Sequence, residues 1–262
     1  MKSKYLMIGA AVCAVLFLFS GVMLFRQYAD EKQSAEAFEN IAALVEDETP
    51  PADEPQETEP PQRSQSAFEK YAAVYEQNND FVGWITIDGT RIDYPVMQTI
   101  DSPNYYLKRN FEKKYSNYGI PYVQENCDLE FSDNCVLYGH HMNNGTMFAD
   151  LCKYADEDFY KEHKTIRFDT LSGFGEYEIV AAFKTVAYSE QGYKYYHFTR
   201  ADSAEDFNAY IAECKKLSFY DTGVTAEYGD KLITLSTCEY SRTNGRMVVV
   251  AKQVVAPAGE VG

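Results

Sequence analysis

An uncharged apolar run near the N-terminus constrains this chain more than any other feature of its sequence. The run covers residues 5–25, YLMIGAAVCAVLFLFSGVMLF, which is 21 residues. At about 1.5 Å of rise per residue, a helix of this length crosses the roughly 30 Å hydrocarbon layer of a bilayer. The run is longer than the apolar region of a secretory signal peptide, and no small-x-small cleavage site stands out after it. We therefore expect an uncleaved transmembrane anchor over residues 5–25.

The charges beside this run predict its orientation. Lys2 and Lys4 precede it, Arg26 follows it, and the chain then becomes strongly acidic. By the positive-inside rule, residues 1–4 stay in the cytoplasm and the bulk of the chain is exported. We expect a single-pass protein of the cell membrane whose folded domain is extracellular.

Residues 26–63 predict a helix followed by a linker. Apolar residues recur at helical spacing over residues 31–45, which indicates a membrane-proximal helix. Residues 46–61, EDETPPADEPQETEPP, hold seven acidic residues, five prolines and no basic residue. Such a segment cannot bury enough apolar surface to fold and behaves as an extended spacer. Two interpretations fit: a stalk that lifts the domain off the membrane, or a linker without a role of its own.

Strand patterns dominate residues 64–262, which we expect to form the folded domain. Eight short segments rich in β-branched and aromatic residues are bounded by turn residues. They lie at residues 83–87, 92–97, 119–123, 134–139, 165–169, 176–187, 231–237 and 246–255. Helical patterns cover residues 64–78, 146–154 and 202–217. Many strands with few helices favour a mostly β fold, either a closed barrel or a sandwich with peripheral helices.

The composition argues against two kinds of partner. The chain carries 24 Lys and Arg against 40 Asp and Glu, a formal net charge of −16, so we expect no nucleic-acid partner. Its six cysteines and four histidines show neither a CxxC pattern nor zinc-ligand spacing, so we expect no metal site and no cofactor. Cys127 and Cys135 could form a bridge or be small buried side chains. Five cysteines lie outside the apolar run, and this odd number leaves at least one thiol unpaired within the chain.

Cys238 is the candidate for a functional thiol, because it follows a strand pattern in TLSTCEYSRTNGRMVVV, residues 234–250. A cysteine acts as a nucleophile only where a nearby cation holds its thiolate. The Asn-Gly turn signal in residues 241–245 predicts that the flanking strands pair antiparallel. Arg246 would then lie across from Cys238, whereas Arg242 would lie on the turn. The alternative for Arg246 is a solvated arginine at a strand end.

Two adjacent histidines follow the strand pattern NCVLYG. Because successive side chains in a strand point to opposite faces, only one of His140 and His141 can face a given site, and alternation does not say which. We expect His163 and His197 at the surface or in packing, since their surroundings are polar or aromatic. The residue pattern alone therefore suggests a Cys, His and Arg site in which the histidine is undecided.

Three segments of the chain resemble the sortase family. NCVLYGHHMNNGTMFADL (residues 134–151) and LITLSTCEYSRTNGRMVVVAK (residues 232–252) are similar to the two signature blocks of sortases. GWITIDGTRIDYPVMQ (residues 83–98) resembles the block that opens their domain. The phrases YGHHM with TMF, and TLSTCEY with VVVAK, resemble class B sortases in particular. The resemblance implies a closed eight-stranded β-barrel with peripheral helices behind an N-terminal transmembrane helix, with helix 202–217 as the insertion of class B.

The resemblance also implies roles for individual residues. By it, Cys238 is the nucleophile, His140 is the acid/base, and Arg246 supplies positive charge to the oxyanion. It further implies contacts with the sorting signal from Leu107, Thr185, Tyr193, Ser236 and Glu239.

The implied reaction is a transpeptidation at the surface of a Gram-positive cell. The enzyme would cleave a C-terminal sorting motif in exported proteins through a thioacyl-enzyme and transfer them to an amine of peptidoglycan or its lipid-linked precursor. A pilin-polymerising sortase with a lysine acceptor is a variant of this function. A membrane-anchored binding protein whose chemistry has lapsed is a different class, which the presence of all three residues opposes. A papain-like hydrolase is disfavoured, because its cysteine opens a helix rather than ending a strand.

Overall fold

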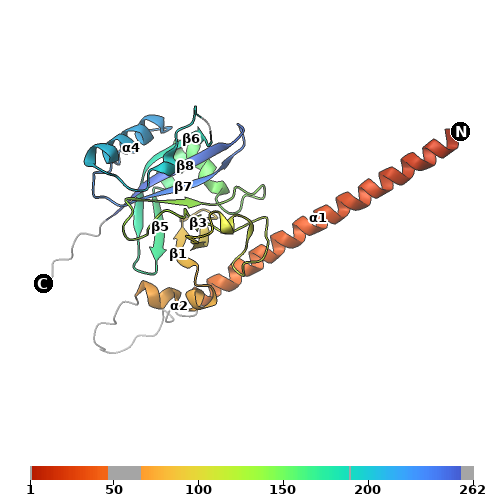
Figure 1. Cartoon of the computed structure of the whole chain (residues 1–262), viewed down its shortest axis with the longest axis horizontal. Helices are drawn as coiled ribbons and strands as arrows, with labels where there is room; N and C mark the ends of the chain where they lie inside the picture. The colour runs from red at the N-terminus through yellow and green to blue at the C-terminus, as the bar shows by residue number, and fades with distance from the viewer. Residues whose placement is uncertain (1, 47–65, 189, 255–262) are drawn as a thin grey trace.

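Eight strands close into a barrel in this computed structural model, which describes residues 2–46, 66–188 and 190–254 (Figure 1). Around the barrel the strands follow the order β1-β2-β3-β4-β7-β8-β6-β5, and β5 pairs with β1 to close it. The β2–β3 and β4–β7 pairs are parallel, and the other pairs are antiparallel. The strands are β1 (Phe81–Thr86), β2 (Asp93–Met97), β3 (Tyr122–Val123), β4 (Asn134–Tyr138), β5 (Thr165–Thr170), β6 (Glu176–Val186), β7 (Leu232–Glu239) and β8 (Gly245–Gln253). The expectation of a closed eight-stranded barrel is confirmed.

One predicted strand is much shorter than its sequence pattern. The pattern covered residues 119–123, but β3 holds Tyr122–Val123 alone. Gly119 has a positive φ of 58°, and the Ile120 N–H bonds to the Tyr106 carbonyl instead of to a neighbouring strand. Pro121 has no N–H to donate. The first half of the pattern therefore packs against the segment that precedes it.

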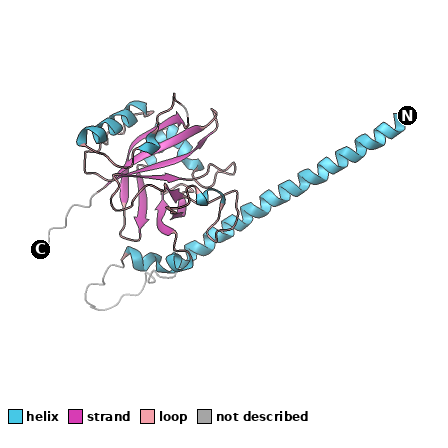
Figure 2. Cartoon of the chain, in the orientation of Figure 1, coloured by secondary structure: helices cyan, strands magenta, loops and turns pink. Residues whose placement is uncertain are grey.

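Helices lie on the outside of the barrel (Figure 2). They are α1 (Lys2–Glu46), α2 (Ala67–Gln77), α3 (Glu157–Glu162) and α4 (Ala204–Leu217), with 3₁₀ helices η1 (Tyr105–Lys108), η2 (Ala149–Ala155) and η3 (Tyr195–His197). Helix α2 begins with a capping box, in which Ser66 and Glu69 each accept a backbone N–H bond of the other. The helix expected over residues 146–154 is the 3₁₀ helix η2, shifted by a few residues.

Helix α1 joins the predicted anchor and the predicted membrane-proximal helix into one element. Its first half projects away from the barrel (Figure 1). Among the described residues, α1 is the helix long and apolar enough to cross a membrane. Its second half packs on the barrel from Asp30 onward, where Asp30 accepts hydrogen bonds from Ser116 and Asn117. Further along, Ile41 is buried.

The predicted acidic linker follows the end of α1. Residues 47–65 lie outside the described residues. They connect α1 to α2, and these two helices contact each other beside the barrel. Both interpretations of the acidic segment, a stalk or a linker without a role of its own, stay predictions.

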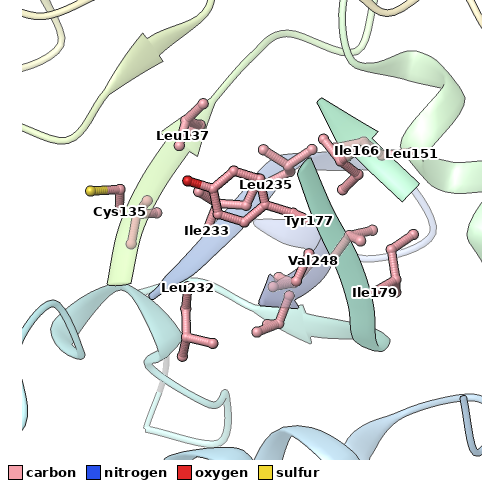
Figure 3. Packing of buried hydrophobic residues seen from close by; sticks show 14 of the residues in the cluster. Cys135, Leu137, Leu151, Ile166, Tyr177, Ile179, Leu232, Ile233, Leu235 and Val248 are labelled. Carbon is pink, nitrogen blue, oxygen red and sulfur yellow. The ribbon is translucent and has the colours of Figure 1, made fainter. Parts of the chain in front are cut away.

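Two apolar clusters hold the fold together. The larger fills the barrel, where Leu137 of β4, Leu235 of β7 and Val248 of β8 gather with side chains of β5 and β6 (Figure 3). Strands β7 and β8 are buried along most of their length, which explains the unbroken apolar run VVVA at residues 248–251. The smaller cluster joins α1 and α2 to β1, β2 and β3. The larger cluster makes the β4–β7–β8 sheet a rigid support for the residues at its end.

Candidate active site

The β7–β8 hairpin places Cys238 directly across from Arg246. The turn uses Asn244 in the left-handed region, with φ of 57°, as the Asn-Gly signal predicted. Gly245 is required there, since a Cβ would lie 2.3 Å from the Glu239 carbonyl oxygen. Strand β7 runs two residues further than expected, so Cys238 is its penultimate residue. The predicted pairing of Cys238 with Arg246 is confirmed, and Arg242 is exposed on the turn.

His140 follows β4, the strand that neighbours β7 on its other side. The parallel β4–β7 register ends at Tyr138 opposite Ser236, which brings the residues after Tyr138 beside Cys238. Gly139 precedes the histidine because a Cβ at this position would lie 2.5 Å from the buried Phe148 ring. Sheet register and close packing therefore deliver His140 to the end of β7.

The His140 imidazole is poised in its neutral form. Its Nε2 lies 2.7 Å from the Leu107 carbonyl, an acceptor, so Nε2 carries the proton of the neutral ring. Burial lowers the pKa of His140, the Leu107 carbonyl opposes this shift, and the Lys108 charge adds to it. At neutral pH the ring can therefore accept a proton, and once protonated it gives the proton up readily.

Arg246 is half-buried and carries positive charge toward the same region. Its guanidinium donates to the Gly245 carbonyl at 2.9 Å. Among the ion pairs formed by the described residues, none includes Arg246, whereas Lys184 pairs with Glu239 at 3.1 Å. The charge of Arg246 is thus available to an anion that forms beside Cys238.

A cleft of about 560 Å³ brings these three residues together. Its walls come from the segment around η1, the residues after β3, the ends of β4, β7 and β8, and the β6–η3 connection. The lining residues are Asn104, Leu107, Tyr122, Gln124, Glu125, Asn126, Tyr138, Gly139, His140, Ala187, Tyr188, Tyr195, Tyr196, His197, Ser236, Thr237, Cys238 and Arg246. The lining therefore combines residues that are far apart in the sequence.

The predicted contacts with a sorting signal divide into two groups. Leu107 and Ser236 line the cleft. The described lining residues do not include Thr185, Tyr193 or Glu239. The Thr185 hydroxyl accepts a hydrogen bond from the Tyr193 N–H at 2.8 Å. The Glu239 carboxylate forms an ion pair with Lys184. Thr185 is nevertheless the β6 residue that pairs with Arg246, so it lies beside the strand position that carries this arginine. Roles in substrate contact stay predictions for all five residues.

The aromatic wall of the cleft was missed by sequence reasoning. Tyr195 is buried and its hydroxyl lies 2.6 Å from the Ser236 hydroxyl. Tyr188 is 79% exposed at the rim, with its ring 6.2 Å from that of Tyr196. His197, expected at the surface or in packing, is exposed and also lines the cleft. The tyrosine-rich stretch GYKYYHF was the available signal, since exposed aromatic clusters on loops favour binding.

The remaining cysteines do not add a second centre. Cys127 and Cys135, which could have bridged, are buried free thiols. Among the residues that the structure describes, no three His, Cys, Asp or Glu side chains gather as metal ligands.

The barrel and the cleft together define a class of protein. A thiol near a strand end, an imidazole and a guanidinium around one cleft suit a cysteine enzyme that transfers acyl groups through a thioester.

Comparison with known proteins narrows this class to one family. Residues 85–254 match the family model of the sortase domain. Sortase B of Listeria monocytogenes is 38% identical over 180 residues, which covers 68% of this chain and 71% of that protein. Sortase B of Staphylococcus aureus is 31% identical over 252 residues, covering 95% and 96%. The chain belongs to the sortase family.

Solved structures agree with this assignment. A Staphylococcus aureus sortase B–substrate complex superimposes with a TM-score of 0.75 at 28% identity, covering 87% of this chain and 100% of that one. Sortase B of Bacillus anthracis in complex with AAEK1 gives a TM-score of 0.71 at 29% identity, covering 87% and 100%. The protein is thus a class B sortase, a cysteine transpeptidase of the cell surface, as its sequence resemblance implied. This finding overturns the papain-like alternative and the lapsed binding protein.

Proposed function

We propose that this class B sortase uses Cys238 as nucleophile, His140 as general acid and base, and Arg246 as the oxyanion-binding cation. The observation that carries the proposal is the hairpin register, which sets Cys238 across from Arg246 in a cleft that His140 also lines. The substrates are exported proteins with a C-terminal sorting motif and an amine of peptidoglycan or its lipid-linked precursor.

The first half of the reaction forms a thioacyl-enzyme. Neutral His140 first takes the proton of the Cys238 thiol. The resulting thiolate attacks the scissile carbonyl, and the carbonyl oxygen becomes an oxyanion beside Arg246. One oriented donor to such an oxyanion is typically worth about 3–4 kcal/mol of transition-state stabilisation. As the C–N bond breaks, protonated His140 gives its proton to the leaving amine. The low pKa of His140 makes this transfer favourable.

The second half transfers the acyl group to the acceptor amine. Neutral His140 takes a proton from the incoming amine while its nitrogen attacks the thioester carbonyl. The C–S bond breaks and the Cys238 thiolate is regenerated. An amide replaces the amide that was cleaved, so the reaction needs no energy source beyond the original peptide bond.

The proposed placement is a single-pass membrane protein. Residues 5–25 form the anchor, residues 1–4 are cytoplasmic, and the barrel is extracellular. Two observations support this: α1 is exposed from Val12 to Tyr28, and its contacts with the barrel begin at Asp30. The site would then lie close to the outer membrane face, where exported proteins and lipid-linked precursors both occur.

The test uses the full-length chain in detergent micelles with a peptide library of candidate sorting motifs. Triglycine is the first acceptor amine to try, because one solved sortase B structure is a complex with triglycine. Mass spectrometry follows both cleavage and ligation. A lysine side chain offered in place of triglycine tests the pilin-polymerising variant.

Matched variants assign the roles. Cys238→Ala should abolish ligation, whereas Cys13→Ala, which removes an exposed thiol on α1, should not change it. Arg246→Ala should lower kcat/KM by about 10²–10³-fold, and Arg242→Ala on the same turn should leave it within about twofold. Equal losses in the two arginine variants, or ligation by Cys238→Ala, would contradict the assignment.

A further inference from the structure

The pairing of β4 with β7 continues beyond the end of β4 through a series of further hydrogen bonds. The strand register ends at Tyr138 opposite Ser236. Past this point the Gly139 N–H donates to the Ser236 carbonyl at 3.2 Å. The Thr237 hydroxyl then donates to the Gly139 carbonyl at 2.8 Å. The next contact in this series is made by His141.

His141 contacts the backbone of the proposed nucleophile. Its Nδ1 lies 3.1 Å from the carbonyl oxygen of Cys238. A carbonyl oxygen only accepts, so this bond requires the ring proton on Nδ1. In return, the Tyr240 hydroxyl donates to the His141 carbonyl at 2.8 Å, and the two rings pack with centroids 5.0 Å apart. The end of β7 is therefore joined at two points to the residue that follows His140.

The Cys152 thiol lies against the same imidazole nitrogen. Its Sγ is 3.4 Å from Nδ1 of His141 and 3.9 Å from the Cys238 carbonyl oxygen. Burial raises the pKa of Cys152 to about 11, so this thiol is uncharged at neutral pH. An uncharged thiol is a weak acceptor, which leaves the carbonyl oxygen as the stronger partner for the Nδ1 proton.

We propose that His141 is a positioning residue: its Nδ1–H fixes the Cys238 carbonyl and thereby the direction of the thiol toward His140 and Arg246. The proposal rests on the proposed function, in which Cys238 is the nucleophile. Strand β8 holds Cys238 on one side through the hairpin, and His141 holds it on the β4 side, where the backbone register has ended. A displacement of about 1 Å at a reacting atom can lower a rate by about 100-fold, so this contact matters for catalysis.

The adjacent histidines thus have complementary tasks. His140 turns toward the cleft to exchange protons, while His141 turns to the other side of the same segment and holds the partner strand. Because the two residues are consecutive, a movement of this segment carries the acid/base and the fixed carbonyl together. The distance between His140 and Cys238 is therefore set by two short connections rather than by the whole barrel.

A spectroscopic experiment tests the hydrogen bond without any substrate. The full-length chain, labelled with ¹⁵N at histidine, is measured in micelles by long-range ¹H–¹⁵N correlation at a pH where the rings are neutral. His141→Ala assigns the signal. A pyrrole-type Nδ1 on His141 is expected, and a neutral ring protonated at Nε2 alone overturns the proposal.

A kinetic experiment tests the positioning role. His141→Asn keeps an N–H donor near the place of Nδ1, His141→Gln carries one nearer to Nε2, and His141→Ala has none. We expect His141→Ala to lower kcat by about 10–100-fold with KM within about twofold, and His141→Asn to recover most of the loss while His141→Gln does not. His163→Ala serves as the control for loss of a histidine away from the cleft.

The outcomes separate this proposal from the proposed function. A wild-type chain without Cys238-dependent ligation refutes the proposed function, and the tautomer measurement then still decides whether the hydrogen bond exists. An active wild type with an equally active His141→Ala variant, or an Asn variant no better than the Gln variant, refutes the positioning role alone.

Discussion

Replacing Ile41 with alanine tests whether the second half of α1 belongs to the catalytic body. The Ile41 side chain is 4% exposed and lies in the smaller core cluster with Tyr71, Phe81 and Trp84. A buried Ile-to-Ala change costs about 2–5 kcal/mol. Ile41 lies on a helix outside the barrel, where neighbouring side chains can close part of the space that the alanine leaves. We therefore expect a loss in the lower part of this range, about 2–3 kcal/mol.

Trp84 supplies the assay, because it is the one tryptophan in the chain. Its indole lies 6.2 Å from the Tyr71 ring, nearly parallel to it, and donates to Asp93 at 2.7 Å. Urea unfolding of the full-length chain in micelles is followed by tryptophan fluorescence. With a slope of about 1–3 kcal/mol per molar urea, the Ile41→Ala midpoint should fall by roughly 1 M or more.

The control is Asn40→Ala, which changes the exposed neighbour on the same helix. It should leave the midpoint within about 0.3 M of the wild type, since surface substitutions usually change stability by less than about 0.5 kcal/mol. An unchanged midpoint for Ile41→Ala would refute the packing argument. A large fall in both variants would instead indicate a general loss of helix stability.

Docking of α1 also bears on the active site. Glu31 accepts a hydrogen bond from the Asn144 side chain at 3.0 Å. Asn144 lies in the loop closed by the bridge between His141 and Met147, directly after the proposed acid/base residue. Detachment of α1 would release this loop, so the Ile41→Ala variant should also lose ligation activity beyond its loss of stability.

Two further predictions concern His140 and its neighbour. Gly139→Ala places a Cβ against the Phe148 ring, so we expect the free energy of unfolding, measured by thermal unfolding, to fall by about 1–3 kcal/mol. At temperatures where the variant is folded, its ligation activity should fall by a larger proportion. Full activity would refute the close packing. An NMR titration should give His140 a pKa below its usual value of about 6.5, because burial lowers it. The unfolded state then takes up the proton first as pH falls, so this contribution to folding stability is present above about pH 6.5 and is lost toward the folded-state pKa. His140→Gln should flatten that pH dependence, and an unchanged profile would show that the ring is not desolvated.

Local patterns predicted the hairpin of the site because its determinants lie within a few residues. The Asn-Gly signal sets the turn, the turn sets the register, and the register sets Arg246 across from Cys238. Alternation likewise predicted that His140 and His141 diverge. It could not show that both meet the strand of Cys238, because that depends on the parallel β4–β7 pairing, and parallel partners are far apart in sequence.

The aromatic wall of the cleft and the docking of α1 depend on tertiary contacts, so local sequence patterns could not predict them. Tyr188 and Tyr196 belong to a chain with 22 tyrosines, and only the path of the β6–η3 connection selects those that line the cleft. The docking of α1 was missed for a similar reason. A helix with apolar residues at Phe38 and Ile41 predicts a buried face, but not the surface that buries it.

The acidic linker connects two helices that contact each other beside the barrel. A change in the length of this segment should therefore alter stability little, because the entropy of loop closure changes by only about 0.6 kcal/mol for each doubling of length. In the proposed membrane placement, the distance between the anchor and the barrel depends on the short helical stretch from Arg26 to Asp30. A helix rises about 1.5 Å and turns about 100° per residue, so one residue added to this stretch would both lift the barrel and rotate its cleft relative to the membrane. In that placement, residues 26–30 would set how the cleft faces its substrates.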